Sequence, residues 1–301
     1  MIYDLIIVGA GPAGITATVY AARKRLNFLV ITLDIGGQAA WSGDVENYTG
    51  YQFITGPDLT SKFEEHMRTY KVTVKENEEV EEIKRTGTTI RVKTHKGEYE
   101  SKTLIIASGK MSKELNVPGE KEFKHKGVTY CATCDGPLFS GKDVAVIGGS
   151  NSALDAALQM IRIASHVYVI NPGSALGGDV IMREKVEKNR LVTVLNGSKI
   201  TAIVGEKMVT GIKIMRDNKE ETIPVEGLFV EVGLIPNSKF AVDLDKNKYG
   251  EIKINMQNET NVPGIFAAGD VTDVPQKQII IAAGEGSKAA LSAFKYLNQL
   301  K

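Results

Sequence analysis

The only two cysteines of the chain, Cys131 and Cys134, are separated by two residues and are followed at once by Asp135. A C-x-x-C pair is typical of a redox dithiol or of half a zinc site. Structural zinc usually takes four nitrogen or sulfur ligands, and the four histidines show no paired spacing that would complete such a set. The pair therefore predicts dithiol redox chemistry and no metal site. Two inert, buried thiols are the remaining alternative.

Asp135 adds an acid–base group next to the dithiol. The thiolate is the attacking form of a cysteine, so a proton must leave and return during disulfide exchange. A carboxyl group beside Cys134 can carry that proton to or from a leaving thiolate. The alternative is a helix N-cap or turn carboxylate that has no part in the chemistry.

A glycine-rich turn lies near the start of the chain. Gly9, Gly11 and Gly14 follow the apolar stretch 3–8 and precede a stretch of helical character. Bare backbone at these positions leaves room for a pyrophosphate at the N-terminus of the helix. Asp34 lies 20 residues beyond the last glycine, where a ribose-binding acid is expected. The pattern predicts a dinucleotide site but does not say which dinucleotide binds.

The same arrangement returns after the strand predicted at 143–147, but its turn is altered. Ser150 stands where the pattern has its middle glycine, and its Cβ would intrude on the approach of a pyrophosphate. The next strand ends in Asn171-Pro172-Gly173, which offers neither a carboxylate for a ribose hydroxyl nor an arginine for a 2′-phosphate. We therefore expect the fold to be kept and the second nucleotide site to be degraded. A working site of unusual chemistry is the alternative.

Two units of strand, glycine turn, helix and strand in one chain predict an α/β fold. The apolar stretch 264–270 ends in Gly-Asp, and if it joins the first sheet, the first domain is discontinuous. The expected fold is two Rossmann-like, three-layer nucleotide-binding domains, with the second inserted into the first. The predicted domains are 1–112 with 241–301 and 113–240, with linkers near 110–118 and 237–243.

Composition narrows the range of partners. The chain has 301 residues, a formal net charge of +1 and 43% hydrophobic residues, which is ordinary for two globular domains. This charge balance supplies no chain-wide attraction for nucleic acid or an anionic membrane. No apolar run approaches the roughly 20 residues of a membrane span, so we expect a cytoplasmic protein without nucleic acid or membrane partners. A basic cluster before the dithiol, either a solvated loop or a docking patch for an acidic protein, comprises Lys121, Lys124, His125 and Lys126.

Several motifs, in their order along the chain, resemble the low-molecular-weight thioredoxin reductase family over essentially the whole length. The segment 278–286 is also similar to the reductase portion of the alkyl hydroperoxide reductase flavoprotein. The resemblance implies the FAD/NAD(P)-binding disulfide reductase fold, with FAD in the first domain. The motifs are Gly9-Ala10-Gly11-Pro12-Ala13-Gly14, Gly36-Gly37-Gln38, Val45-Glu46-Asn47, Cys131-Ala132-Thr133-Cys134-Asp135-Gly136 and Phe266-Ala267-Ala268-Gly269-Asp270.

The resemblance also implies roles for individual residues. By similarity, Cys134 would face the flavin and Cys131 would attack the disulfide of a thioredoxin-like protein. The FAD pyrophosphate would lie on Gly9, Gly11, Pro12, Ala13 and Gly14, with the adenosine ribose near Asp34. The rest of the cofactor would lie among Gly37, Gln38 and Asn47 at the isoalloxazine entrance, Gly109 at a strand end, Gly269 and Asp270 at the ribityl chain, and Gln278 and Ile279 by the flavin ring.

The altered second turn bears on the electron donor. Family members that use pyridine nucleotides carry an intact second glycine turn, whereas this chain has Ser150 and Asn171-Pro172-Gly173. It is therefore most similar to the ferredoxin-linked, pyridine-nucleotide-independent branch, which implies reduced ferredoxin as donor, a thioredoxin-like protein as acceptor and a homodimer. Reduction by NADH or NADPH through an atypical loop is one alternative. A flavin-binding redox sensor with little turnover is another, from a different class of function.

Overall fold

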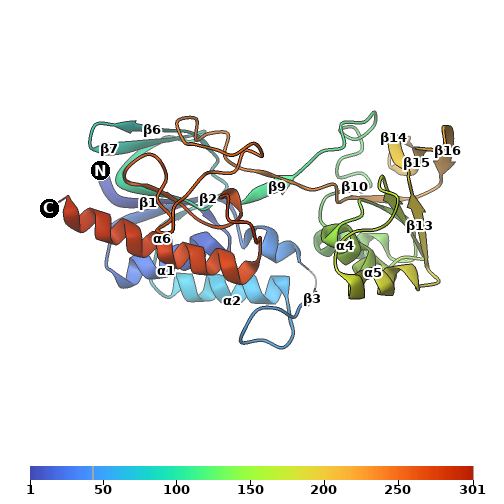
Figure 1. Ribbon diagram of the computed structural model, residues 1–301, viewed down its shortest axis with the longest axis horizontal. Helices are drawn as coiled ribbons and strands as arrows, with labels where there is room; N and C mark the ends of the chain where they lie inside the picture. The colour runs from blue at the N-terminus through green and yellow to red at the C-terminus, as the bar shows by residue number, and fades with distance from the viewer. Residues whose placement is uncertain (43, 301) are drawn as a thin grey trace. The chain divides into compact units, whose positions relative to one another are not determined.

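The computed structural model describes residues 1–42 and 44–300, and the side chains of residues 44 and 134 lie outside this description. The chain divides into two compact units (Figure 1). The first unit comprises Met1–Met111 and Ile235–Lys301, and the second comprises Ser112–Leu234. The first unit is therefore discontinuous in sequence, with the second inserted into it.

The first unit is built on a seven-stranded sheet of order β5-β2-β1-β8-β7-β6, in which β19 also pairs with β8. Strands β5, β2, β1, β8 and β19 pair in parallel with one another. Strand β7 pairs antiparallel with β8, and β6 pairs antiparallel with β7. The strands are β1 (Ile2–Ala10), β2 (Phe28–Ile35), β5 (Val74–Lys75), β6 (Val80–Thr86), β7 (Thr89–Thr94), β8 (Glu98–Ile106) and β19 (Ile265–Ala267), with a small β3 (Asp44–Val45) and β4 (Ile54–Thr55) pair. The helices are α1 (Pro12–Arg23), α2 (Gly56–Arg68) and α6 (Ile279–Gln299), with short 3₁₀ turns η1 (Gly37–Trp41) and η3 (Gly269–Val271).

Strand β1 explains why the start of the chain is apolar without alternation. Leu5 and Ile7 point into a core shared with α1 and α6, whereas Ile6 and Val8 point into the core on the opposite face. A parallel strand buried on both faces needs apolar residues at every position. Figure 1 shows α1 and α6 lying together along the sheet of this unit.

The C-terminal part of the chain completes the first sheet. Strand β19 pairs in parallel with β8, with Ile265 opposite Leu104. The expected fold class, an α/β disulfide reductase fold, is confirmed. The first boundary between the units, after Met111, falls within the expected linker 110–118, where Lys110–Ser112 forms β9 and pairs with β18 (Leu234–Pro236). The predicted linker 237–243 lies within the first unit, where Ala241 is fully buried and the Asn237 amide donates to the carbonyl of Gly109 at 3.0 Å.

The second unit has a five-stranded parallel sheet of order β10-β17-β11-β12-β13. One face packs on α4 and α5, and the other packs on the antiparallel sheet β14-β15-β16. The elements are β10 (Val128–Thr129), α3 (Ala132–Asp135), η2 (Gly136–Phe139), β11 (Asp143–Ile147), α4 (Asn151–Ile161), β12 (His166–Asn171), α5 (Val180–Glu187), β13 (Val192–Asn196), β14 (Lys199–Gly205), β15 (Val209–Arg216), β16 (Lys219–Ile223) and β17 (Gly227–Val230). Helices α2 and α5 and strands β13 and β16 were not anticipated from the sequence.

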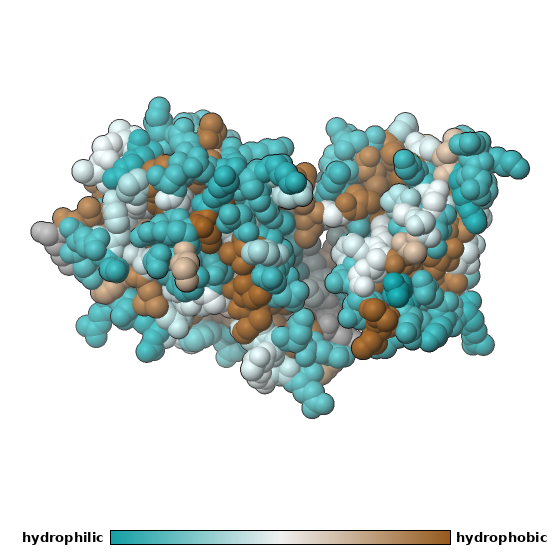
Figure 2. Space-filling view, viewed as in Figure 1, coloured by the Kyte–Doolittle hydropathy of each residue, from teal (hydrophilic) through white to brown (hydrophobic). Residues whose placement is uncertain are grey.

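The surfaces of both units are largely polar on the face shown in Figure 2, with apolar residues in smaller groups. Within residues 1–42 and 44–300, no helix combines the length and the apolar character that a membrane crossing requires. The longest of the described helices, α6, has charged and polar residues scattered among its alanines and packs on the first sheet.

Candidate active site

The first glycine turn joins β1 to α1, and its glycines have different tasks. Gly9 has a φ of +101°, and a Cβ there would lie 2.3 Å from the carbonyl oxygen of Ala107. A Cβ on Gly14 would lie 1.9 Å from the carbonyl oxygen of Gly9. The fold therefore requires glycine at both positions. Beside Gly11, in contrast, the nearest protein atom would be 3.9 Å from a Cβ, which leaves room for a ligand.

The N-terminus of α1 opens onto this room. Gly11 is the N-cap residue, no side chain caps the helix, and Pro12 occupies its first turn. The backbone N–H groups at a helix N-terminus carry partial positive charge and attract phosphate. A Cβ on Gly269, whose φ is +75°, would lie 2.9 Å from the Cβ of Ala13, so the Gly-Asp motif lies against the same turn. The turn and the motif together form a cradle that fits a pyrophosphate.

Hydrogen bonds of one side chain link the carboxyl ends of β1 and β2 next to the cradle. The Thr32 hydroxyl accepts the N–H of Ala10 at 3.1 Å and donates to the carbonyl of Asp34 at 2.5 Å. The side chain of Asp34 is exposed at the end of β2. Its position at the carboxyl end of a parallel strand is that of a ribose-binding acid in such folds.

Hydrogen bonds bring other expected cofactor residues together in pairs. The Gln38 amide donates to the carbonyl of Lys110 at 2.9 Å, directly after Gly109, which has a φ of +62°. The Asn47 amide donates to the side-chain oxygen of Gln278 at 3.1 Å, across 231 residues of sequence. Ile279 begins α6 and packs on the small core of Val45, Ile54 and Leu59. Gly37 lies beside the cradle, because a Cβ there would be 3.4 Å from the Cα of Gly11.

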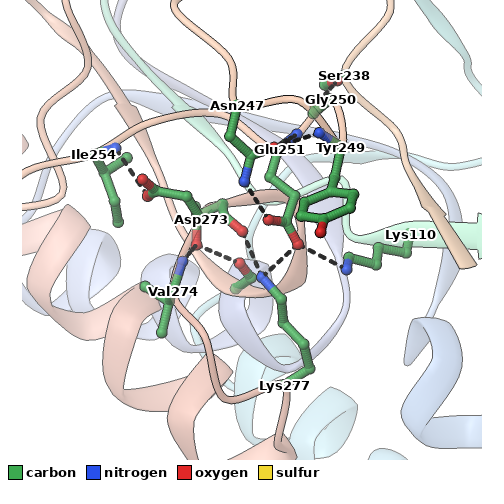
Figure 3. A network of polar contacts seen from close by, with 12 residues as sticks. Lys110, Ser238, Asn247, Tyr249, Gly250, Glu251, Ile254, Asp273, Val274 and Lys277 are labelled. Atoms are coloured by element: carbon green, nitrogen blue, oxygen red, sulfur yellow. Dashed lines mark hydrogen bonds and ion pairs between the residues drawn. The ribbon is translucent and has the colours of Figure 1, made fainter.

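Figure 3 shows a charged cluster in the first unit, centred on the carboxylate of Glu251. Lys110 and Lys277 donate to one oxygen at 2.9 and 3.1 Å, and Asn247 donates to the other at 2.6 Å. Burial by itself would raise the pKa of Glu251, but these three donors lower it to about 2. The carboxylate is therefore ionised at every physiological pH and links three segments distant in sequence.

Asp270 lies close enough to this cluster to interact with it. Burial raises the pKa of the Asp270 carboxyl group, and the positive charges of Lys277 and Lys110 oppose that rise. The two lysines thus favour the ionised form of an acid that the family resemblance assigns to the ribityl chain. None of the three charged cluster residues was singled out from the sequence.

The dithiol segment lies in the second unit. Cys131 is disulfide-bonded and half-buried directly before α3, and the side chain of Cys134 lies outside the described part of the chain. The Thr129 hydroxyl accepts the N–H of Cys131 at 3.2 Å and donates to Oδ2 of Asp135. Asp135 is the N-cap residue of η2, but its side chain makes no capping bond there, so of the two structural alternatives only a turn carboxylate remains beside the role in proton transfer.

A second set of polar contacts leads away from the dithiol along α4. Thr133, between the two cysteines, donates to the side-chain oxygen of Gln159 at 2.8 Å. Gln159 in turn donates to Asp155 at 2.9 Å. On the other side, the Tyr130 hydroxyl donates at 2.7 Å to Glu120, whose carboxylate also accepts two backbone N–H groups. The dithiol segment is therefore anchored to both the body of the unit and its incoming loop.

The loop after β12 packs against part of the second glycine turn. The Asn171 side chain is buried, with the residue only 4% exposed, and a Cβ on Gly149 would lie 2.3 Å from its Oδ1. The Gly177 amide donates to the Gly149 carbonyl at 2.7 Å, and the Asp179 amide donates to Asn151 Oδ1 at 2.7 Å. The loop after β12 therefore lies against Gly149, whereas Ser150, the N-cap residue of α4, is exposed.

Glu231, directly after β17, adds an acid to the same place. Burial raises the pKa of this carboxyl group to about 8, although Ser152 donates a hydrogen bond to it, and the charge of Asp155 contributes to the rise. Ser152 is in the first turn of α4, and Ser150, the N-cap residue, lies 3.4 Å from it between hydroxyl oxygens. At neutral pH the Glu231 carboxyl is therefore mostly protonated and adds little negative charge near the N-terminus of α4.

The chain matches the model of the pyridine nucleotide-disulphide oxidoreductase family over residues 3–286. The chain belongs to this family. It is 42% identical over 299 residues to alkyl hydroperoxide reductase F of Staphylococcus aureus, covering 98% of this chain but 59% of that relative. The thioredoxin reductase of Lactococcus lactis is similar in structure, with a TM-score of 0.93 at 33% identity and 99% of each chain covered. The T. acidophilum thioredoxin reductase has a TM-score of 0.91 at 37% identity, again over 99% of each chain.

The chain is therefore similar, in sequence motifs and in fold, to disulfide oxidoreductases of the thioredoxin reductase type. FAD, expected from the resemblance, is its cofactor. The open cradle beside Gly11 and the uncapped N-terminus of α1 fit the pyrophosphate of this cofactor. The chain spans 59% of the length of the alkyl hydroperoxide reductase F relatives that it matches.

Proposed function

We propose that the protein reduces the disulfide of a thioredoxin-like protein, with FAD in the first unit and the Cys131–Cys134 pair as the site of exchange. Two features support the acceptor: the disulfide of Cys131 next to an acid, and the likeness to two thioredoxin reductases. When bound, FAD accepts electrons singly and delivers them in pairs. The cradle residues Gly9, Gly11 and Gly14, with Gln38, Asn47, Asp270 and Gln278, would bind and orient it.

In the exchange, the Cys131 thiolate attacks the disulfide of the partner, forms a mixed disulfide and releases one partner sulfur as thiolate. The Cys134 thiolate then attacks the sulfur of Cys131, which restores the disulfide and releases the second partner sulfur. Two electrons pass from the dithiol to the partner, whose sulfurs take up two protons. Asp135 carries a proton between the cysteine pair and a leaving sulfur.

We infer that the donor is reduced ferredoxin, and the altered second glycine turn supports this inference. Ser150 stands where the pattern has its middle glycine, and Asn171 and the loop after it lie against Gly149 in the same turn, which supports a second site that does not hold a pyridine nucleotide. Energetics allow the transfer: an iron–sulfur potential near about −400 mV against about −270 mV for thioredoxin corresponds to roughly 6 kcal/mol for two electrons. From the resemblance we also propose that the protein is a homodimer and that it acts in the cytoplasm.

Reduction by NADH or NADPH is the second candidate. It is favoured by membership of the pyridine nucleotide-disulphide oxidoreductase family, which takes its name from this donor. It requires the loop after β12 to move away from Gly149 before a nucleotide enters. The flavin-binding sensor is the third candidate, and it predicts slow reduction by every donor.

One anaerobic experiment distinguishes the three candidates. The holoprotein is mixed with reduced ferredoxin, or with NADH or NADPH at about 0.1 mM, within the usual range of KM values, and flavin absorbance is followed. We expect the flavin to bleach fast with reduced ferredoxin and slowly with NADH or NADPH. Reduction of the thioredoxin disulfide should be lost in Cys131→Ser and also in Cys134→Ser. Fast bleaching by either nucleotide would overturn the ferredoxin donor. Slow bleaching by all donors would support the sensor instead.

A further inference from the structure

Thr129, the last residue of β10, touches both ends of the dithiol segment. Its side chain is buried, with the residue 5% exposed. Its hydroxyl accepts the N–H of Cys131 at 3.2 Å and donates its proton to Oδ2 of Asp135. One hydroxyl therefore joins the attacking cysteine to the acid four residues later.

We propose that Thr129 is a positioning residue for disulfide exchange, holding the Asp135 carboxylate in a fixed orientation to the Cys131 backbone. This inference rests on the proposed function, and in particular on Asp135 as the proton carrier. A general acid or base works only within hydrogen-bond reach of the atom that gains or loses the proton. A carboxylate with one oxygen bonded to a buried hydroxyl cannot rotate freely about its Cβ–Cγ bond.

The short length of α3 explains why such a support is needed. The helix has four residues, and its turn is closed by the Asp135 amide donating to the Cys131 carbonyl at 3.2 Å. A single turn is unfavourable by itself, because one hydrogen bond does not offset the ordering of its residues. The hydroxyl of Thr129 adds a second link across the same turn, from outside the helix.

The chemistry of the hydroxyl restricts what can replace it. A hydroxyl has one proton to donate and two lone pairs to accept with. Asp135 takes the proton, so the Cys131 N–H must meet a lone pair, and both contacts depend on the same oxygen. Valine has the shape of threonine without that oxygen, whereas serine retains it.

The test uses the holoenzyme, reduced by light so that the electron donor plays no part. Its reoxidation by a thioredoxin disulfide is followed by rapid mixing across a range of pH. We expect Thr129→Val to slow reoxidation about tenfold, part of the usual contribution of an acid–base group, and to change the pH profile. Thr129→Ser should restore most of the rate. In an Asp135→Asn background, Thr129→Val should have no further effect, because the two residues act as one unit.

The matched control is Thr201→Val. The Thr201 hydroxyl also donates to a carboxylate in the second unit, that of Glu220, at 3.2 Å, but this contact is exposed and lies far in sequence from the dithiol. It should leave the rate unchanged. The proposal is overturned if Thr129→Val slows reoxidation equally in the Asp135→Asn background, or if Thr129→Ser is as slow as Thr129→Val. If Thr129→Val does not fold, judged by circular dichroism, Thr129→Ala replaces it in the same cycle. A wild-type holoenzyme that no thioredoxin disulfide reoxidises would instead refute the proposed function.

Discussion

Replacing Glu251 by glutamine removes the central charge of the cluster in Figure 3. The pKa of Glu251 is about 2 in the folded protein, against 4.5 in the unfolded chain. That difference corresponds to about 3 kcal/mol of stability above pH 4.5, since each pKa unit is worth about 1.4 kcal/mol. The side chains of Glu251 and Lys110 are only 13% and 14% exposed, so solvent screens the pair little. We expect Glu251→Gln to lower the free energy of unfolding of the first unit by this amount at neutral pH.

The pH dependence gives a sharper test. An acid whose pKa is lowered by folding contributes its full stability above the unfolded pKa and loses it as pH falls toward the folded pKa. The difference between wild type and Glu251→Gln should therefore be constant from neutral pH to about pH 5. By about pH 3 it should shrink by about 2 kcal/mol, because wild type alone loses this contribution.

Trp41, the only tryptophan, lies in η1 of the first unit and provides the signal for urea unfolding, with both proteins in the same cofactor state. The matched control is Glu98→Gln, because Glu98 is half exposed and pairs with Arg91 at 3.8 Å. Exposed pairs contribute about 0 to 1 kcal/mol. Equal effects of the two substitutions, or a Glu251→Gln effect independent of pH, would refute the reasoning.

Two further predictions concern the two glycine turns. Gly11→Ala should change the free energy of unfolding of the apoprotein by no more than about 0.5 kcal/mol, because the protein atom nearest to the new Cβ would be 3.9 Å away. The same substitution should weaken FAD binding, which flavin fluorescence measures. Gly14→Ala is the contrast, since its Cβ would lie 1.9 Å from the Gly9 carbonyl oxygen and should unfold the first unit. The pKa of Glu231 is raised to about 8, so the wild-type protein should lose stability as pH rises from about 4.5 to 8. Glu231→Gln should therefore stabilise the second unit by a few kcal/mol at about pH 9 and should have no such effect at about pH 4. Hydrogen exchange of β11 and β17 measures this change, and a gain that is equal at both pH values would contradict it.

Much of the fold was predictable because its signals are local. Continuous apolar stretches mark parallel strands buried on both faces, and the glycines at 9 and 14 mark backbone that no side chain permits. Two of the elements that escaped prediction, α5 and β16, are short and rich in charged residues. Their positions follow from packing on neighbouring strands rather than from their own periodicity.

The amino-acid sequence by itself determined the two glycine turns, the C-x-x-C pair and the absence of a middle glycine at Ser150, because each depends on residue type over a few positions. Only the tertiary structure decided which side chains support them. Lys110 and Glu251 are 141 residues apart, yet they pair at 2.9 Å because β9 and the chain after β18 return to the same place. Asn171 covers Gly149 for a similar reason, since parallel strands bring distant carboxyl ends to one edge of a sheet. Side-chain pairing at such an edge depends on register and burial, which no local pattern records.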